Sequence, residues 1–172
     1  MDSARARLMK ALRGLDRHGR LVMYHPFTAG GEPIYVHAKI MVIDGRSVRV
    51  GSANLNNRSM RLDSECDVVL PVRPGDEDAV ATMATELRDD LLAEHLGSDM
   101  ADVRAAITRL GGLLPAIEDL RGDGRSLRPY ELPDLGATAK WLADSELLDP
   151  EGPEEMFEPL TARGLFRRRR LP

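Results

Sequence analysis

Residues 34–54 read IYVHAKIMVIDGRSVRVGSAN, and this stretch decides the fold. It contains two strand-like runs, residues 34–43 and 47–50, on either side of Asp44-Gly45. Apolar and β-branched runs around an Asp-Gly pair are typical of a β-hairpin with a tight turn. We therefore predict two adjacent antiparallel strands joined at this turn.

The side chains of the first strand divide into two faces, because alternate residues of a strand point to opposite sides of the sheet. One predicted face holds Tyr35, His37, Lys39 and Met41, and the other holds Val36, Ala38, Ile40 and Val42. One predicted face is thus apolar, and the other holds the reactive side chains of His37 and Lys39. Asn54 follows the second strand at the open end of the hairpin, so we expect it to return close to His37.

The remaining periodicity predicts helices and further strands. Helices are predicted at Ala4 to Leu15, Asp76 to Leu96, Asp99 to Leu110 and Ala137 to Leu148. Strands are predicted at residues 20–24, ending at His25-Pro26 because proline lacks a ladder donor, and at residues 65–70. Gly111 to Leu135 is rich in Gly, Pro and charge and is predicted to be mostly loop. The expected class is α/β, with a mixed β-sheet flanked by helices.

Two of these helices carry an apolar stripe. In the first helix the stripe comprises Ala4, Leu8, Ala11, Leu12 and Leu15, and we expect it to pack on a sheet. In the second helix the predicted buried face comprises Val80, Met83, Ala84, Leu87, Leu91 and Leu92.

Length and composition limit which classes of protein this chain can belong to. The chain has 172 residues, of which 42% are hydrophobic and 30% charged, enough for one core with a peripheral appendage. Its single cysteine, Cys66, excludes an internal disulfide framework. No apolar stretch is long enough to cross a bilayer, and the first 15 residues lack a signal-peptide run. We expect a cytoplasmic or peripheral membrane location.

The net charge of −4 conceals an asymmetry along the chain. Residues 1–75 carry a net charge of +5, and residues 76–160 carry −14. The positive part contains the stretch quoted above, as expected for an anionic substrate such as a phosphodiester. The basic run Arg167–Arg170 either contacts an anionic membrane surface or forms a solvated tail.

The residue types in this stretch suit metal-free phosphoryl transfer. A neutral imidazole at His37 acts as a nucleophile or acid, while Lys39 and Asn54 donate hydrogen bonds to non-bridging phosphate oxygens. A metal site is disfavoured, because His37 has no ligand at suitable spacing on its strand and Lys39 repels a cation. We therefore predict neither a metal nor another cofactor.

Two carboxylates complete the candidate site. Glu65, on the following predicted strand, is the best candidate to orient His37 by accepting a hydrogen bond from its far ring nitrogen. Asp44 adjoins the Gly45 turn, so a structural role in the hairpin is favoured over direct participation in the chemistry.

The order His37-x-Lys39-x4-Asp44-x6-Gly51-Ser52-x-Asn54 resembles the HKD motif of the phospholipase D superfamily. The continuation through Asn56-Asn57-Arg58-Ser59-Met60 and Asp63-Ser64-Glu65 is similar to its phospholipase branch. The resemblance implies a catalytic half-domain at residues 1–96 and a helical, loop-rich extension at residues 97–172. It also implies a covalent phosphohistidine, with Ser52 lining the phosphate pocket.

The family builds one active site from two such motifs, and this sequence contains one. The resemblance therefore implies a glycerophospholipid phosphodiesterase or phosphatidyltransferase half that acts as a homodimer or with a partner N-terminal HKD half. Two alternatives stay open: a nuclease of the same family, and an inactive truncated half-enzyme. Few aromatic residues and an acidic second half disfavour nucleic acid.

Overall fold

The computed structural model describes residues 2–131, apart from the side chains of residues 2–5 and 7. These residues belong to two compact units. The first unit includes residues 2–15 and 53–66, and the second consists of residues 16–52 and 67–131. The predicted helix at Ala137 to Leu148 and the Arg167–Arg170 run lie outside the described residues.

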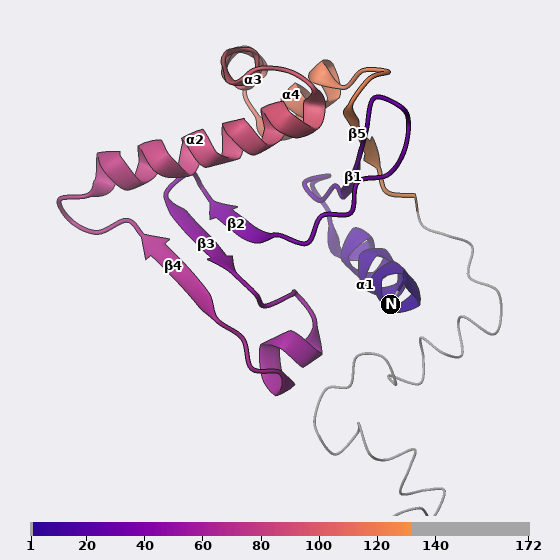
Figure 1. The fold of residues 1–172 in the computed structure, drawn as a ribbon, viewed down its shortest axis with the longest axis vertical. Coiled ribbons are helices and arrows are strands. Elements are labelled where there is room, and N and C mark those ends of the chain that lie inside the picture. Colours follow the sequence, from indigo (N-terminus) through magenta and orange to yellow (C-terminus); the bar gives the residue numbers. More distant parts are fainter. Residues whose placement is uncertain (1, 132–172) are drawn as a thin grey trace, which may run out of the picture. The chain divides into compact units, whose positions relative to one another are not determined.

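The second unit contains a three-stranded antiparallel sheet in the order β2-β3-β4 (Figure 1). Its strands are β2 (Lys39–Ile43), β3 (Ser47–Gly51) and β4 (Asp67–Pro71). The register pairs Lys39 with Gly51, and Gly51 with Asp67. The predicted hairpin is confirmed, and the chain has an α/β fold in which small antiparallel sheets are flanked by helices.

Two strand starts differ from the prediction. β2 begins at Lys39, so His37 precedes the sheet, and β4 begins at Asp67, so Glu65 precedes it as well. Because ladder pairing begins only where the neighbouring strand runs alongside, β-forming residues at 34–38 remain outside the sheet. Within β2 the alternation holds. One face of the sheet is wholly apolar and comprises Ile40, Val42, Val48, Val50, Val68 and Leu70.

The turn of the hairpin depends on two residues with positive φ. Asp44 has φ 53° and Gly45 has φ 62°, and the backbone N–H of Arg46 donates to the carbonyl of Ile43 over 2.9 Å. Two central residues of this kind characterise the primed turns that match the twist of paired strands. A Cβ added at Gly45 would lie 2.9 Å from the Cγ2 of Thr85, which belongs to α2 (Glu77–Leu96).

A second, two-stranded sheet pairs β1 (Tyr24–Phe27) with β5 (Ser126–Pro129). The predicted end of the first strand at Pro26 is wrong. The backbone N–H of Tyr130 donates to the carbonyl of Met23, so Pro26 occupies a non-hydrogen-bonded position where no donor is needed.

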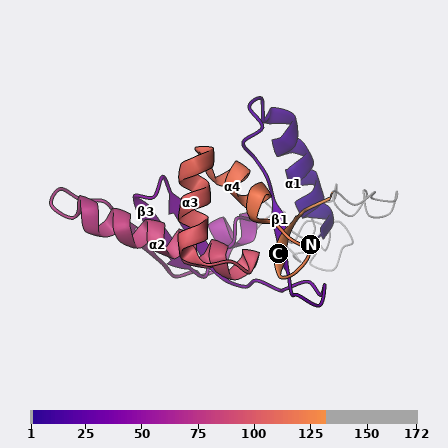
Figure 2. The ribbon, with the colours of Figure 1, turned by 90° about the horizontal axis from the view of Figure 1, so that it is seen from above.

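Three helices complete the second unit: α2, α3 (Met100–Leu110) and α4 (Leu113–Leu120). Helix α3 contacts both α2 and α4 (Figure 2). α2 and α3 begin within one residue of their predicted starts and end as predicted, where Gly97 and Gly111 adopt positive φ. The loop prediction is wrong for residues 113–120 and 126–129, which form α4 and β5, and residues 132–135 of the predicted loop lie outside the described residues. Pro115 is tolerated in α4 because the first turn of a helix needs no N–H there.

The core of the second unit joins α2, α4 and β5. Its buried residues are Leu96, Ile117 and Leu127, with Tyr24, Leu92 and Leu120 packed against them. The predicted buried face of α2 is correct for Ala84, which is fully buried, and wrong for Met83, which is 38% exposed. Packing in this unit continues past residue 96. The domain boundary at that residue stays a prediction about the extent of the family resemblance.

In the first unit, α1 (Asp2–Leu15) forms as predicted, with a different buried face. Ala6 and Met9 are buried, whereas Leu8, Leu12 and Leu15 are exposed. Counting apolar residues does not distinguish these two faces, because a flexible Met fills an irregular gap as well as Leu does. Packing of α1 on a sheet stays a prediction. No helix among residues 2–131 has the length and apolarity needed to cross a membrane.

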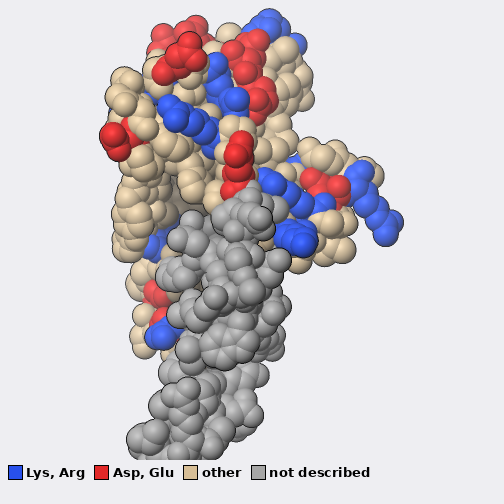
Figure 3. Space-filling view, turned by 90° about the vertical axis from the view of Figure 1, so that its right-hand side faces the viewer, with Lys and Arg blue, Asp and Glu red and all other residues tan. Residues whose placement is uncertain are grey.

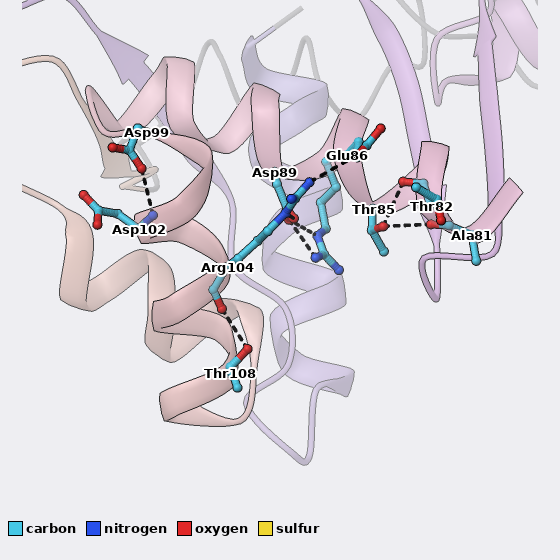
Figure 4. Close-up of polar contacts among 10 residues, drawn as sticks. Ala81, Thr82, Thr85, Glu86, Asp89, Asp99, Asp102, Arg104 and Thr108 are labelled. Atoms are coloured by element: carbon cyan, nitrogen blue, oxygen red, sulfur yellow. Dashed lines mark hydrogen bonds and ion pairs between the residues drawn. The ribbon is translucent and has the colours of Figure 1, made fainter. Parts of the chain in front are cut away.

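A buried carboxylate connects α2 to α3 (Figure 4). The side chain of Asp89 is 1% exposed and accepts hydrogen bonds from the Nε of Arg88 at 2.8 Å and of Arg104 at 3.0 Å. A buried carboxylate requires such partners, since its desolvation is otherwise uncompensated. Asp89 therefore fixes the contact between the two helices.

We expect Asp89→Ala to lower the free energy of unfolding by about 2 kcal/mol, because hydrogen bonds between charged groups are lost at a buried site. Urea unfolding measures this change. The matched control is Asp90→Ala, the exposed neighbour on the same helix, which should change stability by less than about 0.5 kcal/mol. Equal effects of the two substitutions would contradict the role of Asp89.

The hydroxyl of Tyr24 donates to the Oε1 of Glu118 over 2.6 Å and so connects β1 to α4. Burial, followed by this hydrogen bond and the charge of Glu118, raises the pKa of Tyr24 to about 12. The folded-state pKa exceeds the unfolded value. This contribution to stability is therefore present below about pH 10 and lost as the pH rises toward 12.

Ultraviolet titration of the three tyrosines should accordingly show one that ionises about two pH units above the ordinary value. Tyr24→Phe should remove that late step. If all tyrosines of the folded protein ionise together, the assigned contact is wrong.

Candidate functional site

The open end of the β2–β3 hairpin brings several motif residues together in the second unit. Lys39 is the first residue of β2 and lies opposite Gly51, which Ser52 follows directly. The Nζ of Lys39 donates to the backbone carbonyl of His37 over 2.7 Å. His37, Lys39 and Ser52 are therefore neighbours at one end of the hairpin.

His37 is exposed and lies outside regular secondary structure. Its ring stacks on Tyr35, with the ring centroids 6.0 Å apart and the planes inclined by 22°. Tyr35 itself is 87% exposed. The imidazole is thus accessible to a ligand, as nucleophilic or acid–base chemistry requires.

Asp44 lies at the opposite, turn end of the same hairpin. The length of β2 separates it from Lys39 by more than roughly 13 Å, given the rise of about 3.3 Å per residue. A phosphate bound by Lys39 is therefore out of reach of the Asp44 carboxylate of the same hairpin. This placement supports the structural role that the turn geometry gives to Asp44.

An ion pair that the sequence did not indicate lies across the same sheet. The Nη2 of Arg49 on β3 is 2.9 Å from the Oδ1 of Asp67 on β4. A Cβ added at Gly51 would lie 1.7 Å from that Oδ1, so only glycine fits at this position of the motif. The signal that could have indicated Arg49 is strand alternation, because residues 49 and 51 share a face.

Asn54 and Glu65 belong to the first unit. The Nδ2 of Asn54 donates to the Oγ of Ser59 over 3.4 Å, and Ser59 is buried at the start of η1 (Arg58–Leu62). The η1 segment is a short π-helix. The distances from Asn54 and Glu65 to His37 stay predictions.

The η1 segment is closed by an ion pair between Arg58 and Asp63, with Nη2 and Oδ1 2.9 Å apart. Hydrogen bonding from Arg58 lowers the pKa of Asp63. The backbone N–H of Ser59 also donates to the Oδ1 of Asn56 over 2.8 Å. These contacts fix the loop that follows Asn54 within its own unit.

Among residues 2–131, no group of three or more His, Cys, Asp or Glu side chains is arranged to hold a metal ion. On the face shown in Figure 3, Lys and Arg side chains alternate with Asp and Glu rather than forming a patch of one sign.

We expect Asp44→Val to lower the free energy of unfolding by about 1–2 kcal/mol, because a β-branched residue is strained at positive φ. Asp44→Gly should be close to neutral, since glycine adopts this conformation without strain. Thermal unfolding of both variants checks the prediction. A larger loss for the glycine variant would show that the Asp44 side chain, not its backbone, supports the turn.

Comparison with known proteins places the chain in a family. Residues 4–91 match the family model described as cardiolipin synthase, PLD-like domain. Phospholipase D1 of Saccharomyces cerevisiae is 37% identical over 78 residues, which cover 40% of this chain and 5% of that protein.

Two further relatives show the same relation. Phospholipase D of Phytophthora infestans is 37% identical over 87 residues, covering 45% of this chain and 5% of that protein. Phospholipase D zeta 2 of Arabidopsis thaliana is 34% identical over 100 residues, covering 53% and 9%. The chain thus spans less than a tenth of each relative. No solved structure matches significantly. Because the family model covers more than half of the chain, this protein belongs to the phospholipase D-like family.

Proposed function

We propose that this chain is one half of a phospholipase D-like phosphodiesterase or phosphatidyltransferase that acts on glycerophospholipids. The observation that carries the proposal is the placement of Lys39 next to an exposed His37 at the open end of the hairpin. A nucleophile and a cation for the phosphate are adjacent there. Membership of the family and the names of the relatives support the same chemistry.

In the proposed first step, a nitrogen of neutral His37 attacks the phosphorus atom of the diester. The bond from phosphorus to the headgroup oxygen breaks, and the headgroup leaves as an alcohol after taking a proton from a second histidine. The product is a phosphatidyl group attached to His37. In the second step, water or an alcohol gives a proton to that second histidine and attacks phosphorus, releasing phosphatidic acid or a new phosphatidyl ester and free His37.

The other motif residues have supporting roles in this proposal. Lys39 and Asn54 bind the non-bridging oxygens, and Ser52 lines the same pocket. Glu65 orients His37 through its far nitrogen and stabilises the positive charge that appears during attack. No metal is required, because these donors supply the charge that stabilises the transition state.

The second histidine must come from another copy of the motif. A homodimer would supply His37 of a second chain, and a separate polypeptide bearing an N-terminal HKD half would serve equally. The described sheet is consistent with an incomplete assembly, since every residue of β4 is exposed. Contact with an anionic membrane surface would bring such an assembly to its substrate.

A lipid substrate is favoured over nucleic acid. Only 4% of the residues are aromatic, which leaves few side chains for stacking on bases. The acidic part of the chain would also repel a polyanion. A parallel assay with phosphatidylcholine and single-stranded DNA separates the two substrates, and faster cleavage of the DNA would contradict the proposal.

We expect His37→Asn to lower phosphodiesterase activity by at least about 10³-fold, because a nucleophile or its partner acid is lost. The matched control is His18→Asn, an exposed histidine away from the motif, which should retain activity. A reaction quenched in denaturant at neutral pH should show a phosphatidyl adduct on His37 by mass spectrometry. Full activity of the His37 variant would overturn the mechanism.

Light scattering together with activity tests the need for a second copy. An active chain should be at least dimeric, and its specific activity should fall on dilution below the dissociation constant. A monomer that is fully active by itself would contradict the shared site. An inactive monomer would exclude the homodimer as the active form. Assembly with a partner chain that bears an N-terminal HKD half would then remain.

A further inference from the structure

The strands β1 and β5 lie side by side as a two-stranded ribbon whose two faces differ (Figure 1). One face carries Tyr24 and Leu127, which belong to the core of the second unit. Because alternate residues of a strand point to opposite sides, the other side of the ribbon carries a different set of side chains. We call this side the outer face, and it includes His25, Phe27, Arg128 and Tyr130.

Arg128 is the exposed cation of the outer face. Its Cζ atom lies 4.1 Å from the centroid of the Phe27 ring. Among residues 2–131, no carboxylate forms an ion pair with this guanidinium. An aromatic ring engages the charge of a guanidinium and supplies no oxygen acceptor, so the N–H donors of Arg128 stay available to a ligand. The ring also restricts the side chain, which lowers the entropy that binding would cost.

His25 supplies a second donor beside Arg128. The two residues lie directly opposite each other in the register, so their Cβ atoms are separated by about 5 Å. The ring of His25 stacks on that of Tyr130, with the centroids 4.9 Å apart and the planes inclined by 30°. Within the described part of the chain, no acceptor takes up its ring N–H. A stacking contact therefore holds the imidazole, and its donor is left for a ligand.

The two ring contacts run along the same diagonal of the ribbon. Phe27 lies opposite Ser126, two residues before Arg128, and His25 lies opposite Arg128, two residues before Tyr130. Arg128 contacts Phe27, and His25 contacts Tyr130. The four side chains therefore follow one another in the order Phe27, Arg128, His25 and Tyr130. Both hydrogen-bond donors are thus adjacent, with an aromatic ring on either side of the pair.

We propose that Arg128 and His25 form a binding site for a phosphate group, either free phosphate or the phosphate of a lipid headgroup, on the outer face of the β1–β5 ribbon. The planar fork of a guanidinium matches two oxygens of a phosphate, and the imidazole N–H donates to a further oxygen. Phe27 and Tyr130 are positioning residues that act through these two donors. A lipid phosphate bound here would hold this unit against an anionic membrane surface, a role that requires no catalysis by His37.

Nuclear magnetic resonance of the full chain tests the site through the backbone amides of residues 25 and 128. The two probes are inorganic phosphate and a short-chain phosphatidic acid below its micelle concentration. Arg128→Gln should weaken the binding of both probes by about tenfold, because a charge-assisted contact is lost. The matched control is Arg46→Gln, which removes the same charge from an exposed residue of the β2–β3 turn and should change binding by less than about twofold.

Two conservative variants test the geometry of the site. Arg128→Lys keeps the charge and removes the planar fork, so it should weaken binding severalfold. His25→Phe keeps a ring that can stack on Tyr130 and removes the N–H donor, and it should also weaken binding. Thermal unfolding verifies the fold of both variants. Unchanged binding by both would show that charge alone attracts the probes and would overturn the site.

Sedimentation with vesicles distinguishes the two sources of phosphate. Arg128-dependent binding to phosphatidylcholine vesicles that contain phosphatidic acid, absent with phosphatidylcholine alone, supports the lipid source. Arg128-dependent binding of inorganic phosphate without vesicle binding supports free phosphate. Binding to Arg128→Gln as tight as to Arg46→Gln would overturn the site, as would unchanged amide signals of residues 25 and 128 with both probes. No readout requires turnover, so loss of His37-dependent hydrolysis would contradict the proposed function and leave this site intact.

Discussion

The antiparallel register of the β2–β3 hairpin is the constraint on which the site in the second unit depends. The turn at Asp44 and Gly45, closed by the hydrogen bond from Arg46 to Ile43, sets this register. A shift of one residue would move every side chain of β2 to the other face. With the observed register, Lys39 lies opposite Gly51. Two parts of the motif that are separated in the sequence by the hairpin turn therefore become neighbours.

The remaining elements of the second unit hold this hairpin in place. β4 adds a third strand, and its Asp67 pairs with Arg49 over the backbone of Gly51. Helix α2 contacts both strands of the hairpin, and the buried carboxylate of Asp89 secures α2 to α3. The motif glycine Gly51 therefore has a packing reason. Its lack of a Cβ makes room for a carboxylate from a strand 16 residues later in the chain.

Local patterns were sufficient for elements with strong signals. Asp-Gly between two apolar runs predicted the hairpin, and helical periodicity with glycine at the end predicted α2 and α3. They failed where partners distant in sequence decide the outcome. Pro26 remains in a strand because Tyr130, which is distant in sequence, pairs with Met23 and so leaves Pro26 at a position where no donor is needed. The segment after Gly111 forms α4 and β5 because Ile117 and Leu127 complete a core with Leu96.

The sequence alone determined the family, the hairpin, and the residue types that suit metal-free phosphoryl transfer, since these follow from spacing along one continuous segment. Only the tertiary structure decided that Asp67 lies opposite Gly51 and pairs with Arg49. The physical reason is that strand pairing fixes which residues meet across a sheet. The register between β3 and β4 depends on contacts between segments that no tight turn connects, and no local pattern encodes those contacts.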